Sequence, residues 1–175
     1  MFRSSILSVM RRVGLVAGLA SVAIASPITA QSSDPNQLRA AIVFNVLRFI
    51  EFPASKDGTL EFCIAPGTDE AAALRSFSGR RAGSRLVAVR TLRSGSYAGC
   101  DVVYLGSSDR NEIERASARG RLLIGNGRNF IDNGGTVGLV QSGGQVRFQL
   151  NLRAASESQL AISSRLIRLA SRVTR

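Results

Sequence analysis

The chain has 175 residues, with 23 lysines and arginines against 12 acidic residues and no histidine, which gives a net charge of +11. The absence of histidine removes the commonest general base of enzymes and the commonest metal ligand. Two cysteines alone cannot form a closed zinc site. The composition therefore disfavours a catalytic centre and a metal site, and nothing in it indicates a cofactor.

Residues 1–30 have the order of a secretory signal peptide: basic residues, an apolar stretch, then small residues. The uncharged apolar stretch at 13–25 is shorter than the roughly 20 residues that span a bilayer. We predict cleavage after Ala30, with Ala25 as the alternative. The pair Arg11-Arg12 is a weak indication of a twin-arginine signal, and an uncleaved anchor or a buried helix is the other interpretation of the segment.

The rest of the chain, residues 31–175, is predicted to be one exported domain. Three of the 23 basic residues lie in the leader and none of the 12 acidic ones does, so this domain keeps a net charge of +8. Nucleic acid is an unexpected partner for an exported protein. Anionic lipid head groups or an acidic protein face are more plausible partners, and a charge that only aids solubility is the alternative.

The two cysteines, Cys63 and Cys100, are predicted to form a disulfide. An even number of cysteines in an oxidising compartment favours a disulfide over free thiols. Closing a loop of this length stabilises the folded state by roughly 3–4 kcal/mol in the chain-entropy model.

The first predicted helix covers residues 35–52, with Asp34 as its N-cap and a break before Pro53. It is apolar around most of its circumference, so we expect it to be deeply packed. Asn45 is expected to be buried and hydrogen-bonded, and a contact of Asn45 and Arg48 with a partner is the alternative.

Strands and helices alternate from residue 60 to residue 124. Strands are predicted at 60–65, 85–92, 101–105 and 122–124, and helices at 69–77 and 109–118. The nearly continuous apolar run at 101–105 is typical of a strand covered on both faces.

The last third predicts a hairpin, with arms at 137–141 and 145–150 around Ser142-Gly143-Gly144, and then one long helix over 154–173. The expected core stripe of that helix is Ile162, Leu166, Leu169 and Val173. A flanking row contains Arg165, Arg168, Arg172 and Arg175, and is either a solvated face or a contact with acidic lipid or protein. The fold class is α/β: a single domain with a mixed β-sheet flanked by helices (an α/β/α sandwich), a C-terminal hairpin and a long helix.

Two segments resemble parts of active or binding sites. The turn at residues 125–128 follows a predicted buried strand, where α/β sheets bind phosphates, but ordinary turn geometry explains its glycines as well. Ser163 and Ser164 are potential nucleophiles without a recognisable base, and the only lysine that could activate a serine is Lys56.

Several segments, in order along the chain, resemble the YfiR-like family. The family signature of an aromatic residue, Asn, a basic residue and a final aromatic-Pro pair is matched by FNVLRFIEFP. The other matching segments are 60–64, 99–105, 130–139, 146–151, 154–155 and 160–166. Cys63 and Cys100 match one cysteine pair of the family, and the second pair that some members carry is missing here.

The resemblance implies a periplasmic regulator that is not an enzyme. Such regulators bind the sensor domain of an inner-membrane diguanylate cyclase and repress it, which lowers cyclic di-GMP and biofilm formation. The resemblance also implies that an OmpA-like outer-membrane lipoprotein can sequester the regulator. The oligomeric state, including a homodimer, is left open.

The partner surface is predicted near the hairpin and the final helix, around Phe148, Glu157 and Leu160, from their amphipathic pattern. A periplasmic small-ligand-binding module, with its pocket at the turn of residues 125–128, is the alternative function. An exported hydrolase is a third hypothesis, which the missing base disfavours.

Overall fold

The structure is a computed structural model that describes residues 34–53, 58–93 and 96–175, all within the unit Ser32–Arg175. The predicted signal peptide at 1–30 and Lys56 lie outside the described residues. No helix in the described ranges has both the length and the hydropathy needed to cross a membrane.

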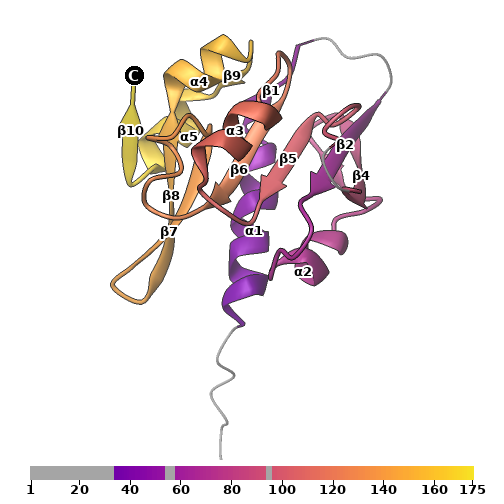
Figure 1. The fold of residues 1–175 in the computed structure, drawn as a ribbon, viewed down its shortest axis with the longest axis horizontal. Helices are drawn as coiled ribbons and strands as arrows, with labels where there is room; N and C mark the ends of the chain where they lie inside the picture. Colours follow the sequence, from indigo (N-terminus) through magenta and orange to yellow (C-terminus); the bar gives the residue numbers. More distant parts are fainter. Residues whose placement is uncertain (1–33, 54–57, 94–95) are drawn as a thin grey trace, which may run out of the picture. The chain divides into compact units, whose positions relative to one another are not determined.

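An eight-stranded mixed sheet forms the centre of this unit, in the order β10-β8-β7-β6-β5-β2-β4-β3 (Figure 1). Its strands are β2 (Thr59–Ile64), β3 (Arg81–Ala82), β4 (Arg85–Thr91), β5 (Val102–Leu105), β6 (Leu122–Asn126), β7 (Val137–Ser142), β8 (Gln145–Asn151) and β10 (Arg172–Thr174). Only β3 with β4 and β7 with β8 pair antiparallel. The largely parallel sheet and the C-terminal hairpin are therefore as predicted.

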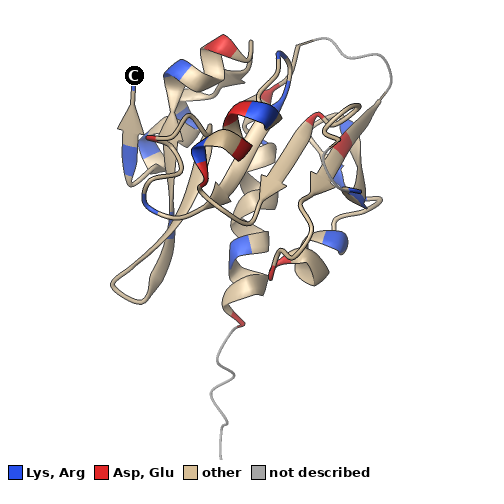
Figure 2. Cartoon of the chain, viewed as in Figure 1, with Lys and Arg blue, Asp and Glu red and all other residues tan. Residues whose placement is uncertain are grey.

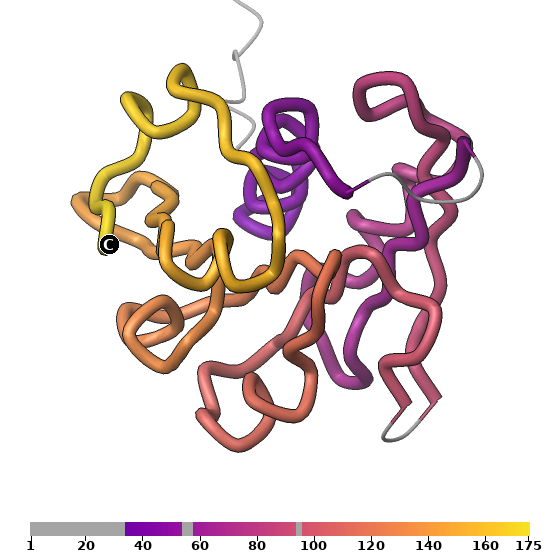
Figure 3. Tube along the Cα trace, turned by 90° about the horizontal axis from the view of Figure 1, so that it is seen from above, coloured from indigo at the N-terminus to yellow at the C-terminus, as the bar shows by residue number. Residues whose placement is uncertain are grey.

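Helices cover both faces of the sheet. The five described helices are α1 (Pro35–Leu47), α2 (Ala71–Arg75), α3 (Arg110–Ala116), α4 (Leu152–Glu157) and α5 (Ser164–Leu169). Figure 3 shows α1 on one side of the strands and α3 on the other. This arrangement confirms the α/β/α sandwich.

Alternation along the central strands divides the core into two layers. In β5, Val102 and Tyr104 face the layer that contains α1 and α2, whereas Val103 and Leu105 face the layer that contains α3. All four side chains are buried, as expected for a strand with helices on both faces.

The first helix is shorter than predicted. Asp34 caps it as expected, because its carboxylate accepts a hydrogen bond from the amide of Asn36. The helix ends at Leu47, however, and Ile50–Glu51 form strand β1, which pairs with β9 (Ala161–Ile162). The residues that were expected to form the last turn of the helix therefore pair as a strand instead.

The prediction of one long C-terminal helix is wrong. The chain leaves α4 at Ser158, passes through Gln159 at a φ of +57°, and forms the short strand β9. Ser163 then caps α5 by accepting a hydrogen bond from the Leu166 amide. After α5, β10 joins the sheet edge beside β8.

This break disperses the expected core stripe and arginine row. Of the four apolar residues of the stripe only Leu166 is fully buried, and Leu169 is 63% exposed. Two of the arginines, Arg165 and Arg168, lie on α5, while Arg172 lies on β10. Local apolar spacing could not reveal the two breaks, which depend on pairing with β1 and β8.

Phe130 fills the space beside the end of β6. Its side chain is fully buried, and a Cβ added to Gly125 or to Gly135 would overlap its ring. The ring therefore lies against two stretches of backbone, and these two glycines are required by packing.

Substituting Gly125→Ala is expected to destabilise the fold by about 1–3 kcal/mol, because the added methyl group forces the Phe130 ring out of its place. Equilibrium urea denaturation measures this change. Gly58→Ala is the control, since nothing lies within 4 Å of a Cβ there, and the double variant Gly125→Ala, Phe130→Leu should recover part of the loss. An equal effect of both single variants would contradict the packing argument.

Candidate functional site

The edge where open α/β sheets commonly bind ligands is filled by protein side chains here. That place is the carboxyl edge between β2 and β5, where the chain turns to opposite faces of the sheet. Thr68, in the loop after β2, donates a hydrogen bond to the carbonyl of Ala65 at 2.8 Å. Gly106, after β5, lies so close that an added Cβ would be 3.2 Å from the Thr68 hydroxyl. The two loops therefore pack against each other at this edge.

A buried polar cluster lies next to these loops. Glu70 is 2% exposed and accepts a hydrogen bond from the side-chain amide of Asn126 at 2.9 Å, with Arg39 of α1 at 3.6 Å. Tyr104 donates a hydrogen bond to the side-chain carbonyl of Asn126 at 3.0 Å. Burial, together with the nearby Glu70 carboxylate, raises the pKa of Tyr104 far above its ordinary value, so the hydroxyl stays neutral. These contacts tie α1 to the strand ends.

In the turn at residues 125–128, the pocket of the alternative hypothesis, the two glycines are closely packed, whereas Arg128 lines a hollow of about 350 Å³ together with Asn129 and Asp132. The Phe130 ring lies against Gly125, and the Ser108 hydroxyl lies 3.4 Å from where a Cβ of Gly127 would be. Gly127 has a φ of +105°, which a tight turn requires and which glycine accepts readily. Turn geometry and packing therefore account for both glycines.

The Ser163 hydroxyl, one of the potential nucleophiles, and the carboxylate of Glu112 both have structural contacts. The Ser163 hydroxyl is used in capping α5. Glu112 accepts hydrogen bonds from Ser107 and Tyr97, and no group of three histidine, cysteine or acidic side chains gathers anywhere in the described ranges.

An apolar groove is the most distinctive surface feature of the described unit. It has a volume of about 300 Å³ and lies between α1, β8 and α5. Its lining is mainly aliphatic and aromatic: Ile42, Asn45, Val46, Phe49, Val146, Arg147, Phe148, Leu166 and Leu169. Nothing else in the described chain covers Leu169, which makes the groove a candidate docking site.

Asn45 does not lie in the core, where it was expected. It was predicted to be buried and hydrogen-bonded within the first helix, but it is exposed and lines the groove. The helix is apolar on nearly every side, so the sequence could not show which side faces the solvent. The structure leaves Asn45 available for contact with a partner.

Arginines surround the groove. Arg147 is part of its lining, and the guanidinium carbon of Arg165 lies 5.6 Å from the centre of the Phe49 ring. Arg168 is exposed on α5. Basic positions also occur on α2, α4 and β10 (Figure 2), so the positive charge is spread over the unit rather than confined to one helix. The groove thus combines an apolar floor with a basic rim.

The three residues of the predicted partner surface do not form one patch. Phe148 is half-buried in the groove. Glu157 is exposed on α4, pairs with Arg153 at 3.8 Å and lines a different hollow. Leu160 is only 6% exposed, because the chain turns after α4 and its amide bonds to the Ala155 carbonyl. Placing Leu160 on the surface was therefore wrong, since it rested on a continuous helix.

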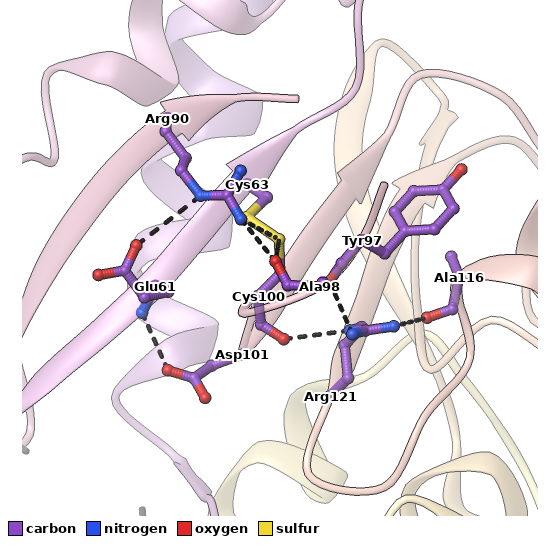
Figure 4. Close-up of a disulfide and its surroundings, with 9 residues drawn as sticks. All are labelled: Glu61, Cys63, Arg90, Tyr97, Ala98, Cys100, Asp101, Ala116 and Arg121. Atoms are coloured by element: carbon purple, nitrogen blue, oxygen red, sulfur yellow. Dashed lines mark hydrogen bonds and ion pairs between the residues drawn. A yellow bond between two sulfur atoms is a disulfide. The ribbon is translucent and has the colours of Figure 1, made fainter. Parts of the chain in front are cut away.

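The opposite face of the sheet carries the disulfide between Cys63 and Cys100 (Figure 4). Cys63 belongs to β2, and Cys100 lies in the loop before β5. Both cysteines are buried, with exposed fractions of 0% and 6%. Arg90 lies beside the bridge, 3.1 Å from the Cys100 sulfur, and donates a hydrogen bond to the Ala98 carbonyl.

Arg121 fixes the loop that contains Cys100. Its guanidinium donates hydrogen bonds to the carbonyls of Tyr97, Cys100 and Ala116 at 2.6–3.1 Å (Figure 4). Burial lowers the pKa of Arg121, which shows how far this cation is withdrawn from water. The bridge and Arg121 together hold the loop on the α3 side of the sheet.

Residues 36–171 match the protein family described as YfiR/HmsC-like (DUF4154). The chain belongs to this family. The match covers every described helix and all but the last strand of the sheet. It bears out the resemblance that the sequence segments indicated.

Solved structures of low sequence identity share the fold. A conserved domain protein from Vibrio cholerae is 12% identical with a TM-score of 0.54, and the match covers 80% of this chain and 60% of that one. The ABC domain in complex with L-Trp from Streptococcus pneumonia is 10% identical with a TM-score of 0.50, with coverage of 80% and 62%. This chain therefore spans about three fifths of each of these proteins. None of the curated proteins compared with it matches.

The YfiR-like family consists of periplasmic regulators without catalytic activity. The disulfide agrees with an oxidising compartment.

An exposed ion pair joins the loop between β6 and β7 to the edge strand β10. Arg172 donates hydrogen bonds to both carboxylate oxygens of Asp132, each at 2.8 Å. These hydrogen bonds, and the charge of Arg172, hold the pKa of Asp132 below its ordinary value.

Removing the disulfide with the double variant Cys63→Ala, Cys100→Ala is expected to lower the free energy of unfolding by roughly 3–4 kcal/mol, because 37 residues separate the two cysteines. Urea denaturation with and without reductant measures the loss. The reductant should shift the midpoint of the wild type and leave that of the variant unchanged. A wild type insensitive to complete reduction would refute this expectation.

Replacing Arg172→Gln is expected to raise the pKa of Asp132 towards the ordinary value of about 3.9. In the wild type the depressed pKa means that the pair's contribution to stability is present above about pH 4 and is lost as the pH falls through the folded-state pKa. NMR titration of the Asp132 carboxyl carbon measures both values. Identical titration curves in the two proteins would show that Arg172 does not cause the shift.

Proposed function

We propose that this protein is a periplasmic regulator that docks onto the sensor domain of an inner-membrane diguanylate cyclase and represses the synthesis of cyclic di-GMP. Membership of the YfiR/HmsC-like family supports the regulatory role. The observation that carries the proposal is the uncovered apolar groove between α1, β8 and α5. Export through the predicted signal peptide brings the protein to the compartment in which such sensor domains lie.

The proposed occupant of the groove is an amphipathic segment of the sensor domain with an apolar face and acidic flanks. Ile42, Phe49 and Leu169 offer the apolar contact, and full burial of an exposed leucine side chain favours binding by about 1.5–3 kcal/mol. Arg147, Arg165 and Arg168 favour acidic flanks, which steer the partner during association.

Repression then follows from a population shift. A regulator that binds only the inactive conformation of the sensor domain increases the population of that conformation by its binding energy. An OmpA-like outer-membrane lipoprotein that competes for the same regulator would relieve the repression by lowering its free concentration. A small-ligand-binding module at the turn of residues 125–128 has less support, because the Phe130 ring fills the space there.

The variant Leu169→Asp is expected to weaken binding to the purified sensor domain by at least about tenfold, because it places a charge on the apolar floor of the groove. Biolayer interferometry with the periplasmic domains of the host's membrane diguanylate cyclases measures the affinity. Cells that carry the variant should contain more cyclic di-GMP.

The matched control is Leu86→Asp, because Leu86 is also an exposed leucine, 40% exposed on β4, and takes no part in the groove. This control should bind like the wild type. Unchanged binding by a folded Leu169→Asp variant, or an equal loss in both variants, would refute the groove as the docking site.

A further inference from the structure

A second hollow lies on another flank of α1 and is lined by arginines instead of apolar residues. It has a volume of about 470 Å³ and is formed by Phe44, Arg48, Arg80, Arg81 and Gly83. The first two residues are the end of α1 and its C-cap, and the others belong to the segment that leads from α2 through β3. None of these residues lines the apolar groove.

Arg80 is held in position by stacking. Its guanidinium carbon lies 3.9 Å from the centre of the Phe44 ring and 5.6 Å from that of Phe77. The two rings are both buried, with centres 4.9 Å apart. A guanidinium that stacks through its flat face keeps the N–H groups of its edge free for an acceptor.

The backbone around Arg80 and Arg81 is also fixed. The amide of Val87 donates a hydrogen bond to the Arg80 carbonyl, and Gly79 donates to the carbonyl of Val87, so the segment is bound to β4. One guanidinium nitrogen of Arg81 donates to the Ser84 carbonyl at 3.0 Å. The side chains of Arg80 and Arg81 are therefore restrained before any ligand binds, which lowers the entropy cost of binding.

The positive charges of the hollow lack acidic partners within the described residues. Among the described residues, Arg48, Arg80 and Arg81 take part in no ion pair. The arginines that do form ion pairs are Arg39, Arg85, Arg90, Arg153 and Arg172. The acidic residue of the adjoining hollow is Glu51, which shares that hollow with Arg48 and the already paired Arg85. Three like charges at one hollow repel each other, and a bound anion would relieve that repulsion.

We propose that this hollow binds the phosphate group of an anionic ligand through Arg48, Arg80 and Arg81. Guanidinium groups match phosphate oxygens in paired, charge-assisted hydrogen bonds. A phosphate group offers more acceptor oxygens to three guanidinium groups than a single carboxylate does. The volume also leaves room for a small group attached to the phosphate.

Isothermal titration of the mature protein with inorganic pyrophosphate tests the proposal. The wild type should bind it, and the double variant Arg80→Gln, Arg81→Gln should bind at least about tenfold more weakly. Arg48→Gln should also weaken binding while it leaves the stacking of Arg80 on Phe44 in place. Thermal unfolding of each variant verifies that the fold is retained.

The control is Arg115→Gln, Arg119→Gln, which removes the same charge from exposed positions on and after α3, across the sheet. This variant should bind pyrophosphate like the wild type. An equal loss in the control would show that only net charge matters and would overturn the site. Failure of the wild type to bind either pyrophosphate at millimolar concentration or vesicles of phosphatidylglycerol would overturn it as well.

A second arm distinguishes the source of the phosphate. Co-sedimentation with vesicles of phosphatidylglycerol, compared with phosphatidylcholine, tests a lipid head group. Sedimentation with phosphatidylglycerol that is lost in Arg80→Gln, Arg81→Gln supports the site with a lipid ligand. Pyrophosphate binding without such sedimentation supports it with a soluble ligand. These measurements are independent of Leu169 and the groove, so either proposal can fail alone.

Discussion

Burial of α1 against the sheet is the constraint on which the other features of the molecule depend. Val43, Val46 and Leu47 lie almost entirely in the core, and Arg39 reaches the buried carboxylate of Glu70. Because the helix is anchored on its buried side, its remaining flanks are presented in fixed directions. One flank forms a wall of the apolar groove, and another forms a wall of the arginine hollow. The packing of α1 against the core therefore fixes the position of one wall of the groove and one wall of the arginine hollow.

The two faces of the sheet carry different features. The α1 face carries both candidate binding surfaces, whereas the α3 face carries the disulfide and the carbonyl contacts of Arg121. A loop fixed by a covalent bond and by the half-buried Arg121 has few conformations in the folded state. The edge between β2 and β5, where related architectures admit ligands, is closed by Thr68 against Gly106. Recognition is thus left to surfaces outside the strand ends.

Sequence reasoning predicted the sheet well, because alternation and apolar runs report burial directly. The run at β5 and the hairpin around Gly143 were predicted from local signals alone. Of the groove, the predicted partner surface included only Phe148, because the α5 wall requires α5 to be a separate short helix. The cap of that helix, Ser163, was a visible signal, but the apolar spacing of Ile162, Leu166 and Leu169 is also typical of one long helix. Only pairing of β9 with β1, which is distant in sequence, decides between the two.

The arginines show why charge alone says little about function. Several of them already have partners in the fold: Arg121 binds backbone carbonyls, Arg85 pairs with Asp101, and Arg172 pairs with Asp132. What distinguishes Arg80 and Arg81 is the absence of an acidic partner in the described residues together with a restrained position at a hollow. The net positive charge of the chain therefore indicates an anionic ligand only where arginines remain without an acidic partner in the described residues. The same reasoning separates Leu169 from Leu86, because both are exposed leucines but only Leu169 lines the apolar groove.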